Sequence, residues 1–418
     1  MTRQRIMDNV YLTYIPSEKF KTNFLSAQMM VPLEQETAPL NALLVNVLSR
    51  GTVSYPDMES ISRRLDDLYG ARMEPVVRKK GENHVFGFLA SCIDDRLLPE
   101  GERVLEPLAD LLGELFTSPV TKNGRLRNDY LISERDNLVD LILSDINDKR
   151  VYASRRLIEE MCSEEPYGIS RLGKANEVEK ISLKKLNAYY QSVLPAGRME
   201  LYYCGSAPEK RIIGMFRRAF AALPRSTEKE IAPTTRKAPP AECRIIRETM
   251  DVTQGKLCIG LRTLSKDAAA TMMMNAMFGA GSTSKLFMNV RDKHSLCYYV
   301  SSSNHWKKGL ITVSSGIDSE NYQKAVDEIF AQLTAIQNGD WEAWEMENAR
   351  CALRNSLRTM EDSAGAMEDF IMGQLATNGE ETIEGLLTSI ESVTPQRIRD
   401  AAYAVKPDTI YFLSDKEV

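Results

Sequence analysis

Residues 41–52 read Asn-Ala-Leu-Leu-Val-Asn-Val-Leu-Ser-Arg-Gly-Thr, and Tyr55-Pro56 follows shortly after. The run of apolar residues predicts a buried helix from about Ala38 to Leu48. Gly51 stands just past the end of this helix, which is a common place for glycine. Taken alone, the stretch predicts an ordinary helix of a hydrophobic core.

The patterns on either side of this helix group strands with strands and helices with helices. In the first half, alternating apolar residues predict strands at 10–15, 24–31, 71–78, 84–92 and 199–204, and longer amphipathic patterns predict helices at 56–70, 100–116, 127–143 and 183–193. In the second half, we expect strands at 243–249, 256–261, 297–303 and 310–315, and helices at 267–278, 284–293 and over most of 322–378. This grouping favours an α+β fold in which helices cover one face of a largely antiparallel sheet.

The chain shows signs of an internal duplication. The tripeptide Lys79-Lys80-Gly81 recurs as Lys307-Lys308-Gly309. The same offset carries Gly51 onto Gly279, and both glycines follow an expected helix. Because the order of elements also agrees, the two halves are expected to be homologous.

A linker separates the two expected domains. Residues 226–240 are rich in Pro, Thr and charged residues and have no hydrophobic periodicity, which is typical of a linker. We therefore expect domains at 1–225 and 241–418, each with a mostly antiparallel sheet of about six strands backed by helices.

Composition excludes several classes of protein. The 418 residues are 43% hydrophobic and 27% charged, as in ordinary globular proteins. The net charge of -5 argues against nucleic acid as a partner, because nucleic-acid binding needs a basic face. No apolar run approaches the roughly 20 residues of a membrane span, and residues 1–8 lack the apolar core of a secretory signal.

Cysteine and histidine usage gives no metal motif. The seven cysteines are scattered without a C-x-x-C pair, which predicts reduced thiols in a cytosolic protein. Only His84, His294 and His305 are present, and no two are three or four residues apart. No helix can therefore present two histidines to a metal, and each is expected to be a structural or surface histidine.

A second informative stretch, residues 278–298, reads Phe-Gly-Ala-Gly-Ser-Thr-Ser-Lys-Leu-Phe-Met-Asn-Val-Arg-Asp-Lys-His-Ser-Leu-Cys-Tyr. A phosphate-binding P-loop would place Gly before its Lys and Ser or Thr after it. Here Ser284 precedes Lys285 and Leu286 follows it, so the stretch does not predict a nucleotide site. An Arg and a Tyr seven residues apart would carry no weight on their own.

Together, the two stretches resemble the pitrilysin and mitochondrial-processing-peptidase family of zinc peptidases, the inverzincins. The family's active-site helix reads H-x-x-E-H followed by Gly-Thr; the two His bind zinc and the Glu activates a water. Aligned on Gly51-Thr52, these positions are Ala42, Val45 and Asn46. Ala and Val can neither bind a metal nor accept a proton, and Asn is a poor zinc ligand. The resemblance therefore implies a member without the zinc motif.

The third zinc ligand of the family is also missing. The resemblance places this ligand, a Glu, at the end of a helical motif E-R-x-x-x-x-x-E. Here Glu134-Arg135 is retained and the ligand position is Leu141. Asp140 is one residue away, which rotates it by about 100° around a helix. The resemblance thus implies that all three ligands and the catalytic base are absent.

The second stretch resembles the family's C-terminal motif, in which a Gly-rich turn leads to Leu-Phe, then an Arg, then a Tyr. Those residues are Arg291 and Tyr298 here. In active members this pair reaches the zinc-bound substrate. Arg supplies a fork of donors for a peptide carbonyl or carboxylate, and a Tyr hydroxyl can donate to a developing oxyanion. The resemblance implies that both residues act in trans, with a partner subunit.

The resemblance covers essentially the whole chain and implies that such chains pair to enclose peptides. Some pairs are heterodimers, in which one chain supplies zinc and the other supplies the Arg/Tyr pair. We therefore expect a non-catalytic subunit of a heterodimeric zinc-dependent peptidase, with an H-x-x-E-H subunit as partner and a peptide or unfolded polypeptide as substrate. No cofactor is expected in this chain, because zinc belongs to the partner. The alternative is a catalytically inactive peptide-binding or scaffold pseudoenzyme, such as a homodimer.

Overall fold

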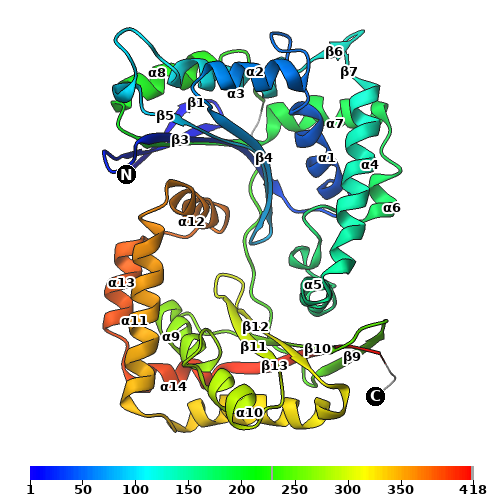
Figure 1. Cartoon of the computed structure of the whole chain (residues 1–418), viewed down its shortest axis with the longest axis vertical. Coiled ribbons are helices and arrows are strands. Elements are labelled where there is room, and N and C mark those ends of the chain that lie inside the picture. The colour runs from blue at the N-terminus through cyan, green and yellow to red at the C-terminus, as the bar shows by residue number, and fades with distance from the viewer. Residues whose placement is uncertain (227–228, 416–418) are drawn as a thin grey trace. The chain divides into compact units, whose positions relative to one another are not determined.

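Two large sheets, each with its own helices, hold most strands of the computed structural model, which describes residues 1–226 and 229–415 (Figure 1). The predicted α+β class is confirmed. One sheet has six strands and the other five. Each contains one parallel pair, β2 with β8 and β13 with β9, and is otherwise antiparallel.

The six-stranded sheet has the order β1-β2-β8-β3-β5-β4. Its strands are β1 (Thr2–Met7), β2 (Val10–Pro16), β8 (Arg198–Gly205), β3 (Thr22–Pro32), β5 (Asn83–Ile93) and β4 (Arg72–Lys80). The associated helices are α1 (Ala38–Leu48), α2 (Met58–Asp67), α3 (Leu105–Thr117), α4 (Asn128–Ser144), α6 (Ala175–Val178), α7 (Leu183–Ala196) and α8 (Glu209–Ala219), with a small hairpin of β6 (Thr121–Lys122) and β7 (Arg125–Leu126).

The five-stranded sheet has the order β11-β12-β10-β13-β9. Its strands are β11 (Tyr299–His305), β12 (Leu310–Ile317), β10 (Gly255–Thr263), β13 (Val405–Ser414) and β9 (Arg244–Thr249). Around it lie α5 (Lys149–Met161), α9 (Ala268–Phe278), α10 (Tyr322–Asn338), α11 (Ala343–Met360), α13 (Ile383–Glu391) and α14 (Pro395–Tyr403), together with the π-helix η4 (Leu286–Lys293). From β2 onward the six-stranded sheet repeats this order, with β9, β13, β10, β12 and β11 matching β2, β8, β3, β5 and β4.

Strand β3 shows how the sequence divides the faces of the first sheet. Leu25, Ala27 and Met29 belong to the hydrophobic core. Ser26 and Gln28 alternate with them and therefore point to the opposite face. Although polar, both are fully buried. This face consequently needs a polar partner as well as a cover.

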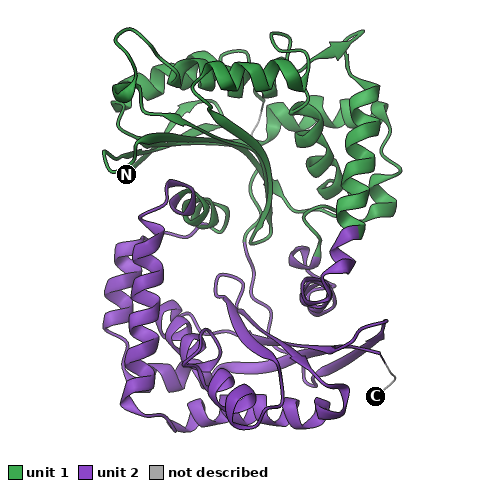
Figure 2. Ribbon diagram, in the orientation of Figure 1, with its two compact units in different colours: residues 1–143, 169–233, 368–377 green, residues 144–168, 234–367, 378–418 purple. Residues whose placement is uncertain are grey.

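The polar partner of this sheet face comes from the other half of the chain, because the two halves exchange segments (Figure 2). Unit 1 comprises residues 1–143, 169–233 and 368–377, and unit 2 comprises residues 144–168, 234–367 and 378–418. These units differ from the expected domains in two places, because a segment of each half packs in the unit formed mainly by the other half.

In unit 1 the exchanged segment is the C-terminal part of α12 (Ala364–Ala376). The fully buried carboxylate of Glu368 accepts hydrogen bonds from Ser26 at 3.1 Å and from the amide of Gln28. It also pairs with the guanidinium of Arg78 at 2.6 Å. The polar residues of β3 are therefore satisfied by a carboxylate that lies some 340 residues away in sequence.

In unit 2 the exchanged segment contains α5, which packs on β10 and β13. Ala153 and Leu157 lie in an apolar cluster with Tyr411 of β13. A Cβ atom at Gly260 would lie 2.5 Å from the sulfur of Met161, so glycine at this position of β10 makes room for the helix.

A buried ionic cluster holds the end of this segment. The Glu165 carboxylate pairs with Arg262 at 2.6 Å and with Lys308 at 2.6 Å. Arg262 also pairs with Asp408 at 2.5 Å. All four side chains are at most 3% exposed, and buried charges persist only when paired.

The repeated Lys-Lys-Gly tripeptides occupy equivalent hairpin turns. Gly81 joins β4 to β5 with φ 58°, and Gly309 joins β11 to β12 with φ 72°, a backbone conformation that glycine adopts readily. Lys80 pairs with Asp369 of the exchanged α12 segment at 2.7 Å, and Lys308 pairs with Glu165 of the other exchanged segment. The duplication thus extends to how each exchanged segment is held.

Several boundaries and elements differ from the sequence-based expectation. Helix α2 begins at Met58 because the Asp57 side chain caps it, whereas Pro56 precedes the cap. The η4 segment is a π-helix rather than an ordinary α-helix. Elements that the sequence patterns did not reveal are β1, β6, β7, β13, α5, α6, α8, α13 and α14.

We predict that Glu165→Ala lowers the free energy of unfolding by about 3 to 5 kcal/mol, because Arg262 and Lys308 lose their buried carboxylate. Urea denaturation followed by circular dichroism measures the change. Glu164→Ala is the matched control, since the Glu164 side chain is 89% exposed and its removal should cost less than about 0.5 kcal/mol. Equal stability of the two variants would contradict a role of this cluster in holding the exchanged segment.

Candidate functional site

The positions that correspond to the zinc motif lie on α1, in the core of unit 1. Ala42 is fully buried and Val45 is 1% exposed. Val45 lines a small apolar cavity of about 10 Å³ together with Met29 and Phe86. Only Asn46 is partly exposed. Ala42 and Val45 therefore serve the packing of α1 against the sheet.

The retained Glu134-Arg135 pair has structural partners. The Glu134 carboxylate forms an ion pair with the Arg50 guanidinium, with 2.8 Å between Oε1 and Nη1. This contact links α4 to the residues that follow α1. The expected third ligand position, Leu141, is 49% exposed, and Asp140 is exposed to solvent. Residues 1–226 and 229–415 contain no group of three or more His, Cys, Asp or Glu side chains arranged to hold a metal ion. The donor set at α1 and α4 does not fit zinc.

A buried polar network beside Ala42 was not found from the sequence. The Asn41 amide nitrogen lies 2.9 Å from Nδ1 of His84, and the Tyr189 hydroxyl donates to the Asn41 carbonyl oxygen at 2.5 Å. Asn41 and His84 are fully buried. Burial lowers the pKa of His84 to about 3, although the backbone carbonyl of Arg171 opposes this effect. His84 is therefore a neutral structural residue, as expected for an isolated histidine.

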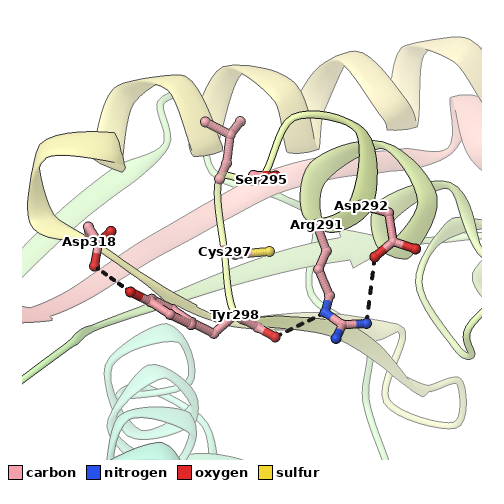
Figure 3. Close-up of a pocket in the computed structure, with 7 residues that line it drawn as sticks. Arg291, Asp292, Ser295, Cys297, Tyr298 and Asp318 are labelled. Atoms are coloured by element: carbon pink, nitrogen blue, oxygen red, sulfur yellow. Dashed lines mark hydrogen bonds and ion pairs between the residues drawn. The ribbon is translucent and has the colours of Figure 1, made fainter.

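In unit 2 the structure brings Arg291 and Tyr298 together at one open pocket of about 500 Å³ (Figure 3). Arg291 lies on η4, whose π-type hydrogen bonds include His294 N–H to the carbonyl of Asn289 at 3.0 Å. Single π turns often occur at functional sites. Ser295 follows with φ 50°, and the chain then reaches Tyr298 just before β11.

The Arg291 guanidinium is oriented by three neighbours. Its Nε donates to the backbone carbonyl of Tyr298 at 3.1 Å. Its Cζ atom lies 4.5 Å from the ring centre of Phe287, and Nη1 is 3.6 Å from the carboxylate of Asp292. The side chain is 40% exposed. The outer guanidinium face is consequently available to a ligand in the pocket.

The Tyr298 side chain is 62% exposed and extends across the pocket. Its hydroxyl donates to the carboxylate of Asp318 at 3.2 Å. Cys297 also lines the pocket but is largely buried. Burial raises the pKa of its thiol above the usual value, although a hydrogen bond with Ser315 and the charge of Arg291 partly oppose this rise. The pocket therefore presents a cation, a phenol and a carboxylate from neighbouring elements.

The preceding Gly-rich stretch has no free lysine for a phosphate. Lys285 is 8% exposed and pairs with Glu345 of α11 at 3.0 Å. The Ser284 hydroxyl donates to the carbonyl of Gly281 at 2.7 Å. These contacts agree with the absence of a P-loop pattern.

Sequence comparison relates this arrangement to known proteins. Residues 180–353 match the family described as Peptidase M16 inactive domain. The chain is 34% identical over 408 residues to the protein named Probable inactive metalloprotease YmfF of Bacillus subtilis, which covers 96% of this chain and 95% of that protein. The chain belongs to the peptidase M16 family. Because its α1 and α4 lack the catalytic motif, it is a catalytically inactive M16 member.

Two further similarities place this M16 chain more broadly. The solved structure of a conserved protein from Enterococcus faecalis superposes with a TM-score of 0.91 at 28% identity, covering 100% of this chain and 99% of that one. The mitochondrial-processing peptidase subunit alpha of Pongo abelii is 23% identical over 333 residues, or 71% of this chain and 61% of that protein. Within residues 1–226 and 229–415, no helix of this M16 chain combines the length and apolar composition required to cross a bilayer.

We predict that Val45→Glu lowers the free energy of unfolding by about 3 kcal/mol or more, because the new carboxyl group would be buried without a partner. Asn46→His, one residue further and partly exposed, should cost less than about 1 kcal/mol. Thermal and urea denaturation of both variants test this. If Val45→Glu retained full stability, α1 could not be packed as described.

We also predict a dependence of stability on pH that belongs to His84. Below about pH 6.5 the unfolded chain binds a proton at His84, whereas in the folded protein the His84 side chain stays unprotonated down to about pH 3. His84 therefore lowers the free energy of unfolding by up to about 1.4 kcal/mol for each pH unit as pH falls through this window. Urea denaturation between pH 7 and 4 should show a shallower decline for His84→Gln than for wild type. Parallel curves would contradict the prediction.

Proposed function

We propose that this chain is the non-catalytic subunit of a heterodimeric zinc-dependent peptidase. It supplies Arg291 and Tyr298 to an active site whose zinc and H-x-x-E-H motif belong to a partner subunit of the same family. Its substrate is a peptide or an unfolded polypeptide. The chain itself holds no cofactor, and we propose that it acts in the cytosol.

One observation supports this proposal above the others. The four positions of the zinc apparatus are Ala42, Val45, Asn46 and Leu141, while Arg291 and Tyr298 meet at an open pocket. An exposed tyrosine and a partly exposed arginine in one pocket are the groups that a role towards substrate would use. Absence of the zinc ligands together with presence of the Arg/Tyr pair is the pattern expected of the non-catalytic subunit at a shared active site.

The chemistry of the pair suits a positioning role. Arg291 is permanently charged and can hold a peptide carbonyl or a terminal carboxylate through its outer donors. The Tyr298 hydroxyl can donate a hydrogen bond to an oxyanion that develops on the scissile carbonyl. Neither group can activate water, so the contribution is substrate orientation and charge stabilisation.

The relatives are consistent with a subunit. Mitochondrial-processing peptidase subunit alpha is by its name one subunit of a peptidase. The relative of Bacillus subtilis is named only as an inactive metalloprotease. That name states inactivity and no partner, so it also fits a second candidate, a peptide-binding pseudoenzyme that assembles without a catalytic partner, such as a homodimer.

Purification of the tagged chain from its native cells distinguishes the two candidates. Recovery of a family member that carries H-x-x-E-H, in equal amount, supports the shared active site. A homodimer without such a partner would instead leave the peptide-binding pseudoenzyme. The recovered complex is then assayed with unfolded polypeptide as substrate.

In that complex, we predict that Tyr298→Phe lowers kcat by about 100-fold, because one donor to the oxyanion is lost. Arg291→Ala should mainly raise KM, because binding of the peptide carbonyl is lost. Lys293→Ala is the control, since Lys293 is an exposed cation on the same helix that does not line the pocket. Unchanged kcat and KM in the first two variants would rule out the proposed roles.

A further inference from the structure

Tyr298 is fixed at three points within unit 2. Its N–H donates to the carbonyl of Gly316 at 2.9 Å, and its carbonyl accepts from Arg291 at 3.1 Å. Its hydroxyl donates to Asp318 at 3.2 Å. Gly316 and Asp318 belong to the end of β12 and the residue after it. The end of β12 and the residue after it therefore hold the backbone N–H and the phenol of this tyrosine.

The third contact limits what the phenol can do. A tyrosine hydroxyl has one proton to donate and otherwise only lone pairs. While that proton is directed at Asp318, the hydroxyl presents only an acceptor to the pocket. A peptide carbonyl or an oxyanion is itself an acceptor and cannot bind to it. Asp318 and a peptide oxygen consequently compete for the same proton.

The contact has the properties of one that can be exchanged. A hydroxyl that donates to a carboxylate usually approaches within about 2.5 to 2.7 Å, whereas this distance is 3.2 Å. Tyr298 is 62% exposed and Asp318 is exposed as well, so water competes with the bond. Asp318 therefore fixes the direction of the phenol without holding its proton strongly.

We propose that Asp318 is a positioning residue that holds the Tyr298 hydroxyl in a resting orientation, from which an incoming peptide oxygen displaces the carboxylate. This inference rests on the proposed function of the pocket and assigns a role to a residue outside the Arg/Tyr motif. The carboxylate keeps the exposed ring aligned across the pocket, and it makes the donor available only when a peptide oxygen replaces it.

Fluorine NMR of 3-fluorotyrosine-labelled full-length protein tests the resting contact directly. The Tyr298 resonance is assigned by its loss in Tyr298→Phe. Asp318→Ala should shift this resonance, because the hydroxyl loses its acceptor. Glu320→Ala, which removes a nearby exposed carboxylate that does not line the pocket, should leave it in place. A Tyr298 resonance that is identical with and without Asp318 overturns the proposal.

Binding of a short fluorescein-labelled peptide of Ala, Ser and Leu, followed by anisotropy, tests the competition. Asp318→Ala should tighten binding by about threefold, because the hydroxyl no longer has to leave an acceptor. In the Tyr298→Phe background the same substitution should have no effect. Unchanged or weaker binding of Asp318→Ala in the Tyr298 background overturns the proposal.

The two experiments separate this proposal from the proposed function. If the peptide binds neither wild type alone nor wild type in the complex recovered with its partner, the function assigned to the pocket is wrong, and displacement by a peptide is wrong with it. The NMR comparison then still decides whether Asp318 holds the tyrosine. If Arg291→Ala weakens binding but Asp318→Ala has no effect, only the role of Asp318 is wrong.

Discussion

The packing of unit 2 depends on the buried ion pairs that the Glu165 carboxylate makes with Arg262 and Lys308. Glu165 belongs to a segment from the first half of the chain. Its charged carboxylate can be buried only because two cations pair with it. Unit 1 repeats the arrangement with the carboxylate of Glu368 and the guanidinium of Arg78. Each sheet thus has one face that is completed by a segment from far along the chain, and that segment brings a buried carboxylate to a cation.

The same structure explains how the zinc motif could disappear without harm to the fold. Histidines and a glutamate in the middle and second half of α1 would need partners inside unit 1, whereas Ala42 and Val45 need none and add to the apolar core. The polar group that remains buried there, Asn41, is satisfied by His84 and Tyr189. Apolar residues at these positions remove the ability to bind zinc, but they leave no buried polar group without a partner and so do not destabilise the fold.

Much of the fold follows from local patterns. The apolar run ahead of Gly51 gave the bounds of α1 correctly, and period-two alternation located most strands. Helix α5 was missed although its buried positions, Ala153, Leu157 and Met161, recur every four residues as in an amphipathic helix; their partners lie in the other half. The sequence could not reveal this exchange, since nothing local encodes which sheet a segment covers.

The site shows the same division. Arg291 and Tyr298 stand out by their spacing and context, but Asp318 lies 20 residues beyond Tyr298 and meets it only through the register of β11 on β12.

Exchange of segments also has a consequence for synthesis of the protein. On the ribosome, α5 (Lys149–Met161) emerges long before its partner β13 (Val405–Ser414). The apolar face of α5 has no partner strand before that point, so the nascent first half cannot reach its final packing until β13 has been synthesised.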